Sequence, residues 1–156
     1  MLAAMSAACG SKTPAADSPD SEGGEANAGG PGAECIANAN GKREKHSDEP
    51  VRIGLRHILV RHVDSKRADG VTRTREQACL RALEALEKLQ ATSDWDAVVA
   101  EYSDEKGAAG RHGSIGDVTR DNLDADFADA AFELDVDELS YVVESASGFH
   151  IILRTN

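Results

Sequence analysis

The spacing of apolar residues divides this chain into two stretches of different character. Between residues 10 and 50 most positions hold small, proline or charged residues, and Ile36 is the one large aliphatic side chain. Such a segment cannot bury enough apolar surface to offset the loss of chain entropy, so we expect residues 10–50 to form a disordered tether. Cys35 within it is expected to be an exposed thiol. From residue 51 onward apolar residues recur regularly, which predicts one folded domain over residues 51–156.

Alternating apolar residues predict the strands of this domain. Strands are predicted at residues 53–62, 115–118, 139–145 and 149–154. The last two are joined around residues 146–148 as a hairpin. Alternation separates the side chains of the last strand into two sets, with Phe149, Ile151 and Leu153 on one face and His150, Ile152 and Arg154 on the other.

Helical periodicity fills the sequence between the strands. A stripe of alanine and leucine, preceded by a capping box of Thr74 and Gln77, predicts a helix that ends near Gln90. Asp94 is placed to cap a shorter helix, and a third helix is predicted to begin at residue 121 or 122. The predicted fold is therefore α+β, with about three to four helices packed around a small antiparallel sheet of about four strands.

Two histidines lie within strongly apolar strands. His57 stands among the aliphatic residues of the first strand, and His150 stands between Phe149 and Ile151 of the last. An imidazole in such surroundings loses its hydration unless a partner replaces it. We expect the two strands to be neighbours in one sheet, which would bring the histidines together. The residues alone leave two interpretations open: a satisfied pair of core histidines, or a functional dyad.

Composition excludes several classes of function. The net charge is −11 and the acidic residues are scattered, which argues against nucleic-acid binding as the main role. The three cysteines form no CxxC motif and the five histidines show no zinc-site spacing, so we expect no metal and no cofactor. No apolar run in the sequence is long enough to span a bilayer.

The first nine residues end in a distinctive way. Small apolar residues precede Cys9, an arrangement that resembles the end of a bacterial lipoprotein signal. In that interpretation residues 1–9 are a truncated signal, Cys9 is lipidated, and the protein is anchored in the bacterial cell envelope by lipid alone. The alternative is an ordinary disordered start and a cytoplasmic protein.

A fixed order of short motifs runs through the folded part. The motifs are His57-Ile58-Leu59-Val60, Tyr102-Ser103-Asp104, Gly113-Ser114-Ile115-Gly116, Ala130-Ala131-Phe132-Glu133-Leu134, Glu138-Leu139-Ser140 and Gly148-Phe149-His150-Ile151-Ile152. Each motif is weak alone, but the ordered set resembles the parvulin family of peptidyl-prolyl cis/trans isomerases. The closing motif and the basic residues after Val60 are most similar to the phosphate-directed Pin-type branch, without its usual WW module.

The resemblance implies a role for each matching residue. Catalytic roles fall on His57, Glu105, Ser147 and His150, with Ser145 as a further hydroxyl near the histidines. The pocket for the proline ring is implied at Ile115, Leu123 and Phe127. A phosphate or carboxylate before the proline is implied to bind Arg61, Lys66 and Arg67. Glu105 stands where Pin-type proteins have cysteine, but other parvulins carry aspartate there, so a carboxylate is compatible with activity.

The resemblance thus predicts an isomerase for X-Pro bonds in protein segments, assisting folding or conformational switching. The expected partners are proline-containing proteins or peptides, and the expected state is a monomer. The alternative is a non-catalytic, parvulin-like module that binds peptides as a chaperone. Tyr141-Val142 replaces the usual Gly-Pro of the family, which leaves room for that alternative.

Overall fold

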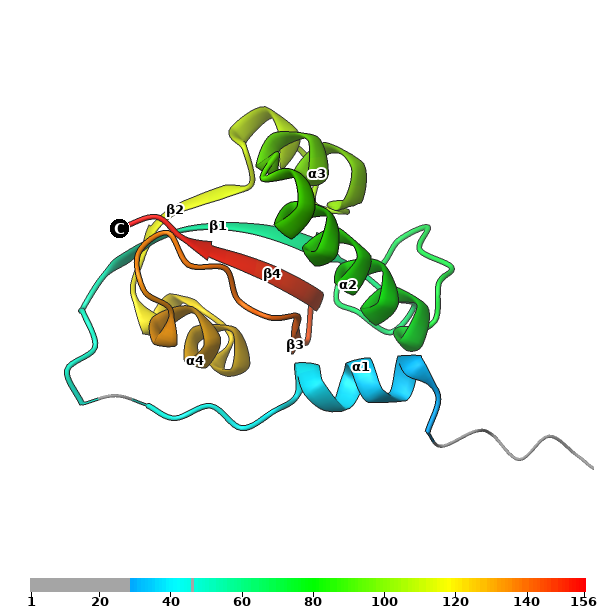
Figure 1. Ribbon diagram of the computed structural model, residues 1–156, viewed down its shortest axis with the longest axis horizontal. Helices are drawn as coiled ribbons and strands as arrows, with labels where there is room; N and C mark the ends of the chain where they lie inside the picture. Colours follow the sequence, from blue (N-terminus) through cyan, green and yellow to red (C-terminus); the bar gives the residue numbers. More distant parts are fainter. Residues whose placement is uncertain (1–28, 46) are drawn as a thin grey trace, which may run out of the picture.

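The computed structural model describes residues 29–45 and 47–156 of the chain. The secondary structure follows the order helix, strand, two helices, strand, helix and a closing hairpin (Figure 1). The elements are α1 (Pro31–Ala39), β1 (Ile53–Val60), α2 (Arg75–Thr92), α3 (Trp95–Tyr102), the short 3-10 helix η1 (Ala109–Arg111), β2 (Ser114–Val118), the 3-10 helix η2 (Arg120–Asn122), α4 (Ala125–Glu133), β3 (Val143–Ser145) and β4 (Gly148–Arg154).

The strands form one antiparallel sheet in the order β2-β1-β4-β3. The predicted α+β fold with a small four-stranded antiparallel sheet is confirmed. The strand predicted at residues 139–145 is shorter, because only residues 143–145 pair continuously and Leu139 makes an isolated bridge to Leu153. The reason is local: the backbone N–H of Ile152 donates to the Ser140 hydroxyl, which takes the place of a strand carbonyl.

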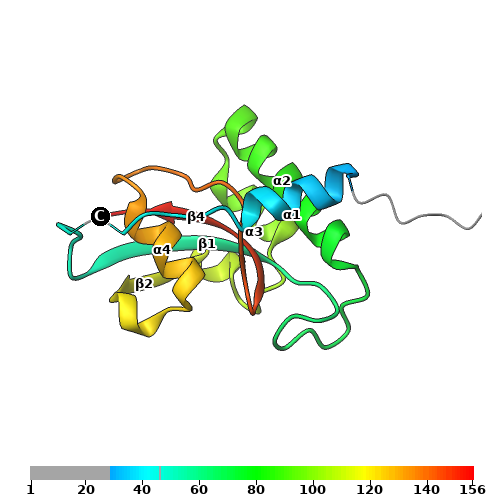
Figure 2. The same ribbon diagram turned by 90° about the horizontal axis from the view of Figure 1, so that it is seen from below.

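The two faces of the sheet are covered by different helices (Figure 2). Alternation sends Ile58 and Ile151 into a large apolar cluster with α1, α2 and α3. The opposite residues, such as Leu55 and Ile152, join a smaller cluster with α4. The central strands β1 and β4 therefore contribute to two separate cores.

Caps set the ends of the helices. The predicted capping box is present at the start of α2, where the Thr74 hydroxyl accepts from the backbone N–H of Gln77. The Asp94 carboxylate caps α3 by accepting from the N–H of Ala97. The third predicted helix begins later than expected, at Ala125, because residues 120–122 form η2 and Leu123 is extended.

The predicted disordered tether of residues 10–50 is wrong for residues 31–39, which form α1. Cys35 is 2% exposed rather than a free surface thiol, and it forms a disulfide with Cys79 of α2. A side chain at Gly32 would place its Cβ 2.7 Å from the Cβ of Glu76, so this glycine permits close helix packing. Apart from Ile36, α1 has no large apolar residue, and its small residues and the disulfide complete its contact with the domain.

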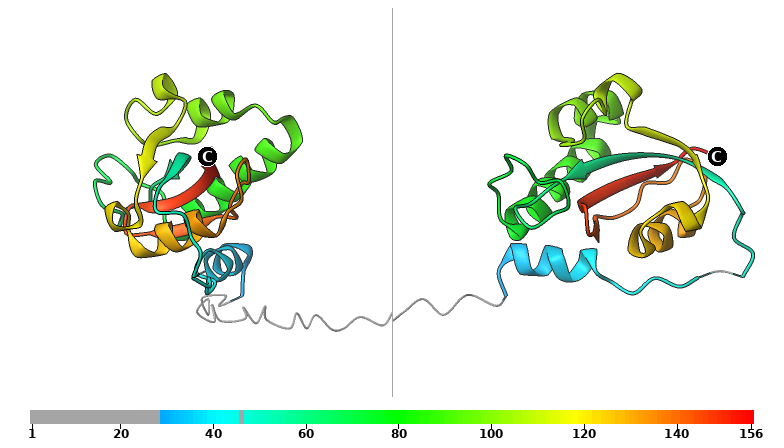
Figure 3. Two further views of the ribbon diagram at one scale, coloured as in Figure 1. Left: turned by 90° about the vertical axis from the view of Figure 1, so that its left-hand side faces the viewer. Right: turned by 180° about the vertical axis from the view of Figure 1, so that it is seen from behind.

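The segment that joins α1 to β1 crosses beneath α4 (Figures 1 and 3). Its charged side chains pair with those of η2 and α4. The ion pairs are Arg43 with Glu133 at 4.0 Å, Lys45 with Asp129 at 3.7 Å and Glu49 with Arg120 at 2.7 Å. This segment therefore lies against the domain over much of its length.

The predicted lipidation residue, Cys9, lies outside the described residues. Within residues 29–45 and 47–156, no helix has the length and apolar character needed to cross a membrane. In the same ranges, no group of three or more His, Cys, Asp or Glu side chains is placed to hold a metal ion.

Candidate active site

Antiparallel pairing of β1 and β4 brings the two strand histidines together. Leu59 pairs with His150 and His57 pairs with Ile152, so the histidines are diagonal neighbours on the face toward α4. The Nδ1 atoms of His57 and His150 are 3.2 Å apart, and the rings are stacked with centroids 5.4 Å apart. Both residues are buried. The pair is satisfied, as a core histidine requires, and it also belongs to a larger polar network.

The network runs from β3 through both histidines to the loop after α3. Its contacts are Ser145 Oγ to His150 Nε2 at 2.8 Å, His150 Nδ1 to His57 Nδ1 at 3.2 Å, His57 Nε2 to Glu105 Oε2 at 2.9 Å and Arg111 NH2 to Glu105 Oε2 at 2.5 Å. A carboxylate only accepts, so His57 Nε2 donates to Glu105. With His57 neutral, His150 Nδ1 donates to His57 and the Ser145 hydroxyl donates to His150 Nε2. Every donor in this chain of bonds then has one acceptor.

The charges of the network follow from its surroundings. Burial lowers the pKa of His150 well below its usual range, and the positive charge of Arg61 adds to this effect. His150 is therefore a neutral imidazole. The hydrogen bond from His57 lowers the pKa of Glu105, and Arg111 lowers it further, although partial burial acts in the opposite direction. Glu105 is therefore a carboxylate anion at neutral pH.

A cavity of about 230 Å³, lined by apolar and polar residues, opens beside the histidines. Its wall includes all three residues predicted to hold a proline ring, Ile115, Leu123 and Phe127, together with His57 and His150. Phe127 is 5% exposed, and its ring meets those of both histidines edge-on, with centroids 5.8 and 4.9 Å away. The aromatic wall and the polar network thus share the two imidazoles.

A second, larger cavity of about 660 Å³ is lined in part by Glu105. Its lining includes the predicted Arg61 and Arg67, and also Arg73, Lys106, Asp69, Asp104 and Glu105. The Arg61 guanidinium donates to the backbone carbonyl of Asp104 at 2.6 Å, while its buried Nε has no hydrogen-bond partner among the described residues. We call the first the apolar cavity, after its three predicted proline-ring residues, and the second the basic cavity, after its arginine and lysine residues.

Two of the predicted residues are placed differently from the others. Lys66 does not line the basic cavity; its Nζ lies 4.0 Å from Asp124 at the wall of the apolar cavity. The contact of Ser147 with the network is through its backbone N–H, which donates to Ser145 Oγ at 3.1 Å. Among the described residues, Ser145 rather than Ser147 therefore supplies the hydroxyl that meets His150.

Sequence reasoning missed Arg111 in this network. Arg111 lies in η1, within the glycine-rich stretch between α3 and β2, where no periodicity marks a side chain as inward. Its Nε donates to the carbonyl of Ser114 at 3.0 Å, which holds the guanidinium against Glu105. The sequence offered one sign of this contact, a basic residue a few positions after Glu105 that could pair with its carboxylate.

Residues 57–156 match the family described as "Rotamase: PPIC-type PPIASE domain". This chain belongs to the PPIC-type peptidyl-prolyl isomerases, the parvulins. It is 38% identical to the putative peptidyl-prolyl cis-trans isomerase dodo of Drosophila melanogaster, over 74% of this chain and 73% of the relative. It is 35% identical to the peptidyl-prolyl cis-trans isomerase ESS1 of Saccharomyces cerevisiae, over 69% of this chain and 67% of the relative.

Solved structures of parvulins have the same fold. The peptidyl-prolyl isomerase ESS1 from Candida albicans matches with a TM-score of 0.64 and 25% identity, over 79% of this chain and 72% of that one. NmPin, the parvulin of Nitrosopumilus maritimus, matches with a TM-score of 0.51 and 32% identity, over 69% of this chain and 98% of that one. The predicted parvulin fold and peptidyl-prolyl isomerase activity are confirmed at the level of the family.

Proposed function

We propose that this parvulin isomerises X-Pro bonds and prefers a phosphorylated Ser or Thr, or an acidic residue, immediately before the proline. One observation carries the proposal: Glu105 connects the two cavities through its contact with His57. It lines the basic cavity, and its carboxylate binds His57, which lines the apolar cavity. A proline ring in the apolar cavity would therefore present the preceding side chain to Arg61 and Arg67.

The chemistry needs no covalent step. Rotation about the peptide bond is slow because it breaks amide resonance, at a cost of about 18–20 kcal/mol. A catalyst must therefore bind the twisted amide better than either planar form. The apolar cavity can hold the ring while the preceding carbonyl turns.

The Glu105 carboxylate supplies a preference for the twisted form. A planar amide carries partial negative charge on its oxygen, and twisting returns that electron density to the prolyl nitrogen. An anion beside the rotating carbonyl opposes the planar form more than the twisted one. In this proposal the histidine network and Arg111 hold Glu105 in place, and Ser145 and His150 complete the wall against which the amide turns.

A peptide panel tests the preference. We expect a Glu-Pro or phospho-Ser-Pro peptide to be turned over about tenfold faster, as kcat/KM, than a matched Ala-Pro peptide, because charge-assisted hydrogen bonds to arginine are stronger than neutral ones. Arg61→Gln should remove most of this difference, whereas Lys66→Gln should retain it. Equal rates on all peptides in the unmodified protein would end the proposal. A protease-coupled assay measures these rates, and a module that binds peptides without accelerating isomerisation would show no rate increase in it.

We further propose that the protein works as a monomer anchored by a lipid on Cys9 to a bacterial cell envelope. Disulfides persist in oxidising compartments and are rare in the cytosol, so the Cys35–Cys79 bond supports this location over the cytoplasmic alternative. Expression in a bacterial host with a complete lipoprotein signal, followed by detergent partitioning, tests it. The protein should enter the detergent phase and Cys9→Ser should leave it in the aqueous phase; aqueous partitioning of both would contradict the anchor.

A further inference from the structure

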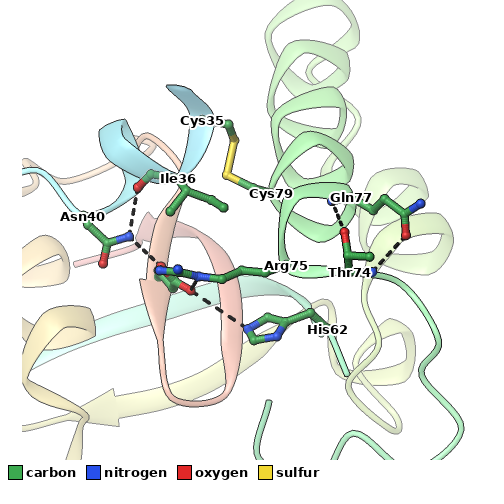
Figure 4. Close-up of a disulfide and its surroundings, with 9 residues drawn as sticks. Cys35, Ile36, Asn40, His62, Thr74, Arg75, Gln77 and Cys79 are labelled. Atoms are coloured by element: carbon green, nitrogen blue, oxygen red, sulfur yellow. Dashed lines mark hydrogen bonds and ion pairs between the residues drawn. A yellow bond between two sulfur atoms is a disulfide. The ribbon is translucent and has the colours of Figure 1, made fainter. Parts of the chain in front are cut away.

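Helix α1 lies outside the part of the chain that matches the family, yet it is locked to the domain. Its Cys35 is joined to Cys79 of α2, and both cysteines are buried (Figure 4). Cys35, Ala39 and the partly buried Ile36 add to the large apolar cluster. The helix is therefore held by a covalent bond and by packing, independently of the segment that follows it.

The C-cap residue of α1, Asn40, reaches a partly buried carboxylate on β3. Asn40 Nδ2 donates to Glu144 Oε2 at 2.5 Å. Arg75, the first residue of α2, donates to both oxygens of the same carboxylate at 2.5 and 2.6 Å, and His62 Nε2 lies 3.9 Å away. In Figure 4 the contacts from Asn40, Arg75 and His62 converge between the two helices and the sheet. The Glu144 side chain is only 11% exposed.

Glu144 is anchored as an anion. Burial alone would raise its pKa, but the hydrogen bonds from Arg75 and Asn40 and the neighbouring charges outweigh it and lower the pKa of Glu144 below its usual value. Arg75 contacts both oxygens of the carboxylate, and such a two-point contact has a more defined geometry than a single one. The carboxylate therefore ties β3 to two helices at once.

Strand β3 depends on this side-chain contact because its own backbone pairing is limited. It has three residues, lies at the edge of the sheet and pairs with β4 alone. Short edge strands are weakly held by backbone bonds. Alternation turns Glu144 toward α1 and α2, while Val143 and Ser145 face α4, where Ser145 meets His150. Displacing Glu144 would therefore move the Ser145 hydroxyl away from the buried Nε2 of His150.

We propose that Glu144, held by Asn40 at the end of α1 and by Arg75 of α2, is a positioning residue that keeps Ser145 against His150. The disulfide-anchored helix α1 is thereby part of the support of the active site. The inference rests on the isomerase activity of the domain but not on its preference for a phosphate or acid before the proline.

Turnover of an Ala-Pro and a Glu-Pro peptide tests the role. Glu144→Ala should lower kcat about tenfold on both peptides, because a small displacement of a positioned group costs one to two orders of magnitude in rate. KM should change less than about twofold, because binding in the two cavities is retained. Asn40→Ala should lower kcat about threefold, as expected for one lost hydrogen bond. Glu144→Gln keeps the size and an acceptor oxygen, so it should recover much of the loss.

A matched control separates positioning from the loss of any ion pair. Lys88 and Glu101 form an exposed ion pair between α2 and α3 at 2.5 Å, far from β3 in the sequence. Glu101→Ala should leave kcat on both peptides unchanged. The combined variant Cys35→Ser/Cys79→Ser should lower kcat. Adding Glu144→Ala to it should lower kcat by less than the product of the two separate fold-changes, because the disulfide and Glu144 both act through the contact between α1 and β3.

Nitrogen chemical shifts of His150 give a readout that a purely structural role would not move. In the unmodified protein Nε2 should show the value of an unprotonated acceptor, and in folded Glu144→Ala and Asn40→Ala variants it should shift toward tautomer exchange. Wild-type kcat together with wild-type His150 shifts in folded Asn40→Ala and Glu144→Ala would overturn the proposal. Equal turnover of the two peptides would instead count only against the acid preference, and absent turnover would leave the shifts to decide the positioning role.

Discussion

The two faces of the sheet share the central strands β1 and β4, but one face forms an apolar core and the other carries the candidate active site. The face toward α2 and α3 is a continuous apolar core, to which Ile58 and Ile151 contribute. The face toward α4 carries a smaller apolar cluster, both network histidines and the apolar cavity. Because strand side chains alternate, one face can be optimised for packing while the other retains buried polar groups and an open cavity. Substitutions should therefore affect stability on the first face and turnover on the second.

The largest effect on stability is expected from Leu86→Ala in α2. Leu86 is buried in the large cluster, and truncating such a leucine costs about 2–5 kcal/mol of unfolding free energy. Chemical denaturation measures this loss. The kcat of the folded fraction should stay within twofold of the original; a selective loss of kcat would show that the two faces are not separable.

The largest effect on turnover is expected from Phe127→Ala on the other face. Its ring forms the wall of the apolar cavity and touches both histidines, so kcat/KM should fall about 100-fold, equivalent to roughly 2.7 kcal/mol of transition-state stabilisation. Phe127→Leu should retain more activity and more stability. Full activity in a folded Phe127→Ala protein would contradict the pocket assignment.

Leu123→Ala, at a partly buried position of the same cavity, should lower turnover with a smaller loss of stability.

An intermediate effect is expected from Glu105→Gln, with a defined pH dependence. The pKa of Glu105 is lowered from 4.5, chiefly by the hydrogen bond from His57. Its ionised form therefore stabilises the fold above pH 4.5, and this contribution is lost as the pH falls below 4.5 through the folded-state pKa. Turnover should fall over the same acidic pH range. Glu105→Gln should lower kcat about tenfold and remove this fall of turnover at acidic pH. An unchanged pH profile in the variant would exclude Glu105 as the titrating group.

The smallest effect is expected from Lys66→Ala. Its exposed ion pair with Asp124, at 4.0 Å, is worth less than about 1 kcal/mol, and Lys66 lies outside the basic cavity. The ratio of kcat/KM for acidic and neutral peptides should change less than twofold. Arg67→Ala, within the cavity, should change it more. A larger effect of Lys66 would mean that the preceding side chain binds on the side of Asp124.

Much of the fold was predictable because it depends on local periodicity. Apolar strand patterns predicted that His57 and His150 lie on neighbouring strands, and the capping box of Thr74 and Gln77 marked the start of α2. The ordered motifs of the parvulins then linked Phe127 to the same site. The place of Arg111 in the network could not be predicted from periodicity, because a glycine-rich loop has no repeating geometry from which a side-chain direction follows.

Residue pattern alone predicted the class of fold and the strands that carry the histidines, since each depends on neighbours within a few positions. The order of the short motifs along the chain indicated the family. Tertiary structure decided the pairing of Cys35 with Cys79, the choice of Ser145 over Ser147 and the contact of Asn40 with Glu144. The last joins residues 104 positions apart, and the disulfide spans 44. Such contacts arise from how whole elements pack, and a segment with few large apolar residues gives no local sign that a partner distant in the sequence will order it.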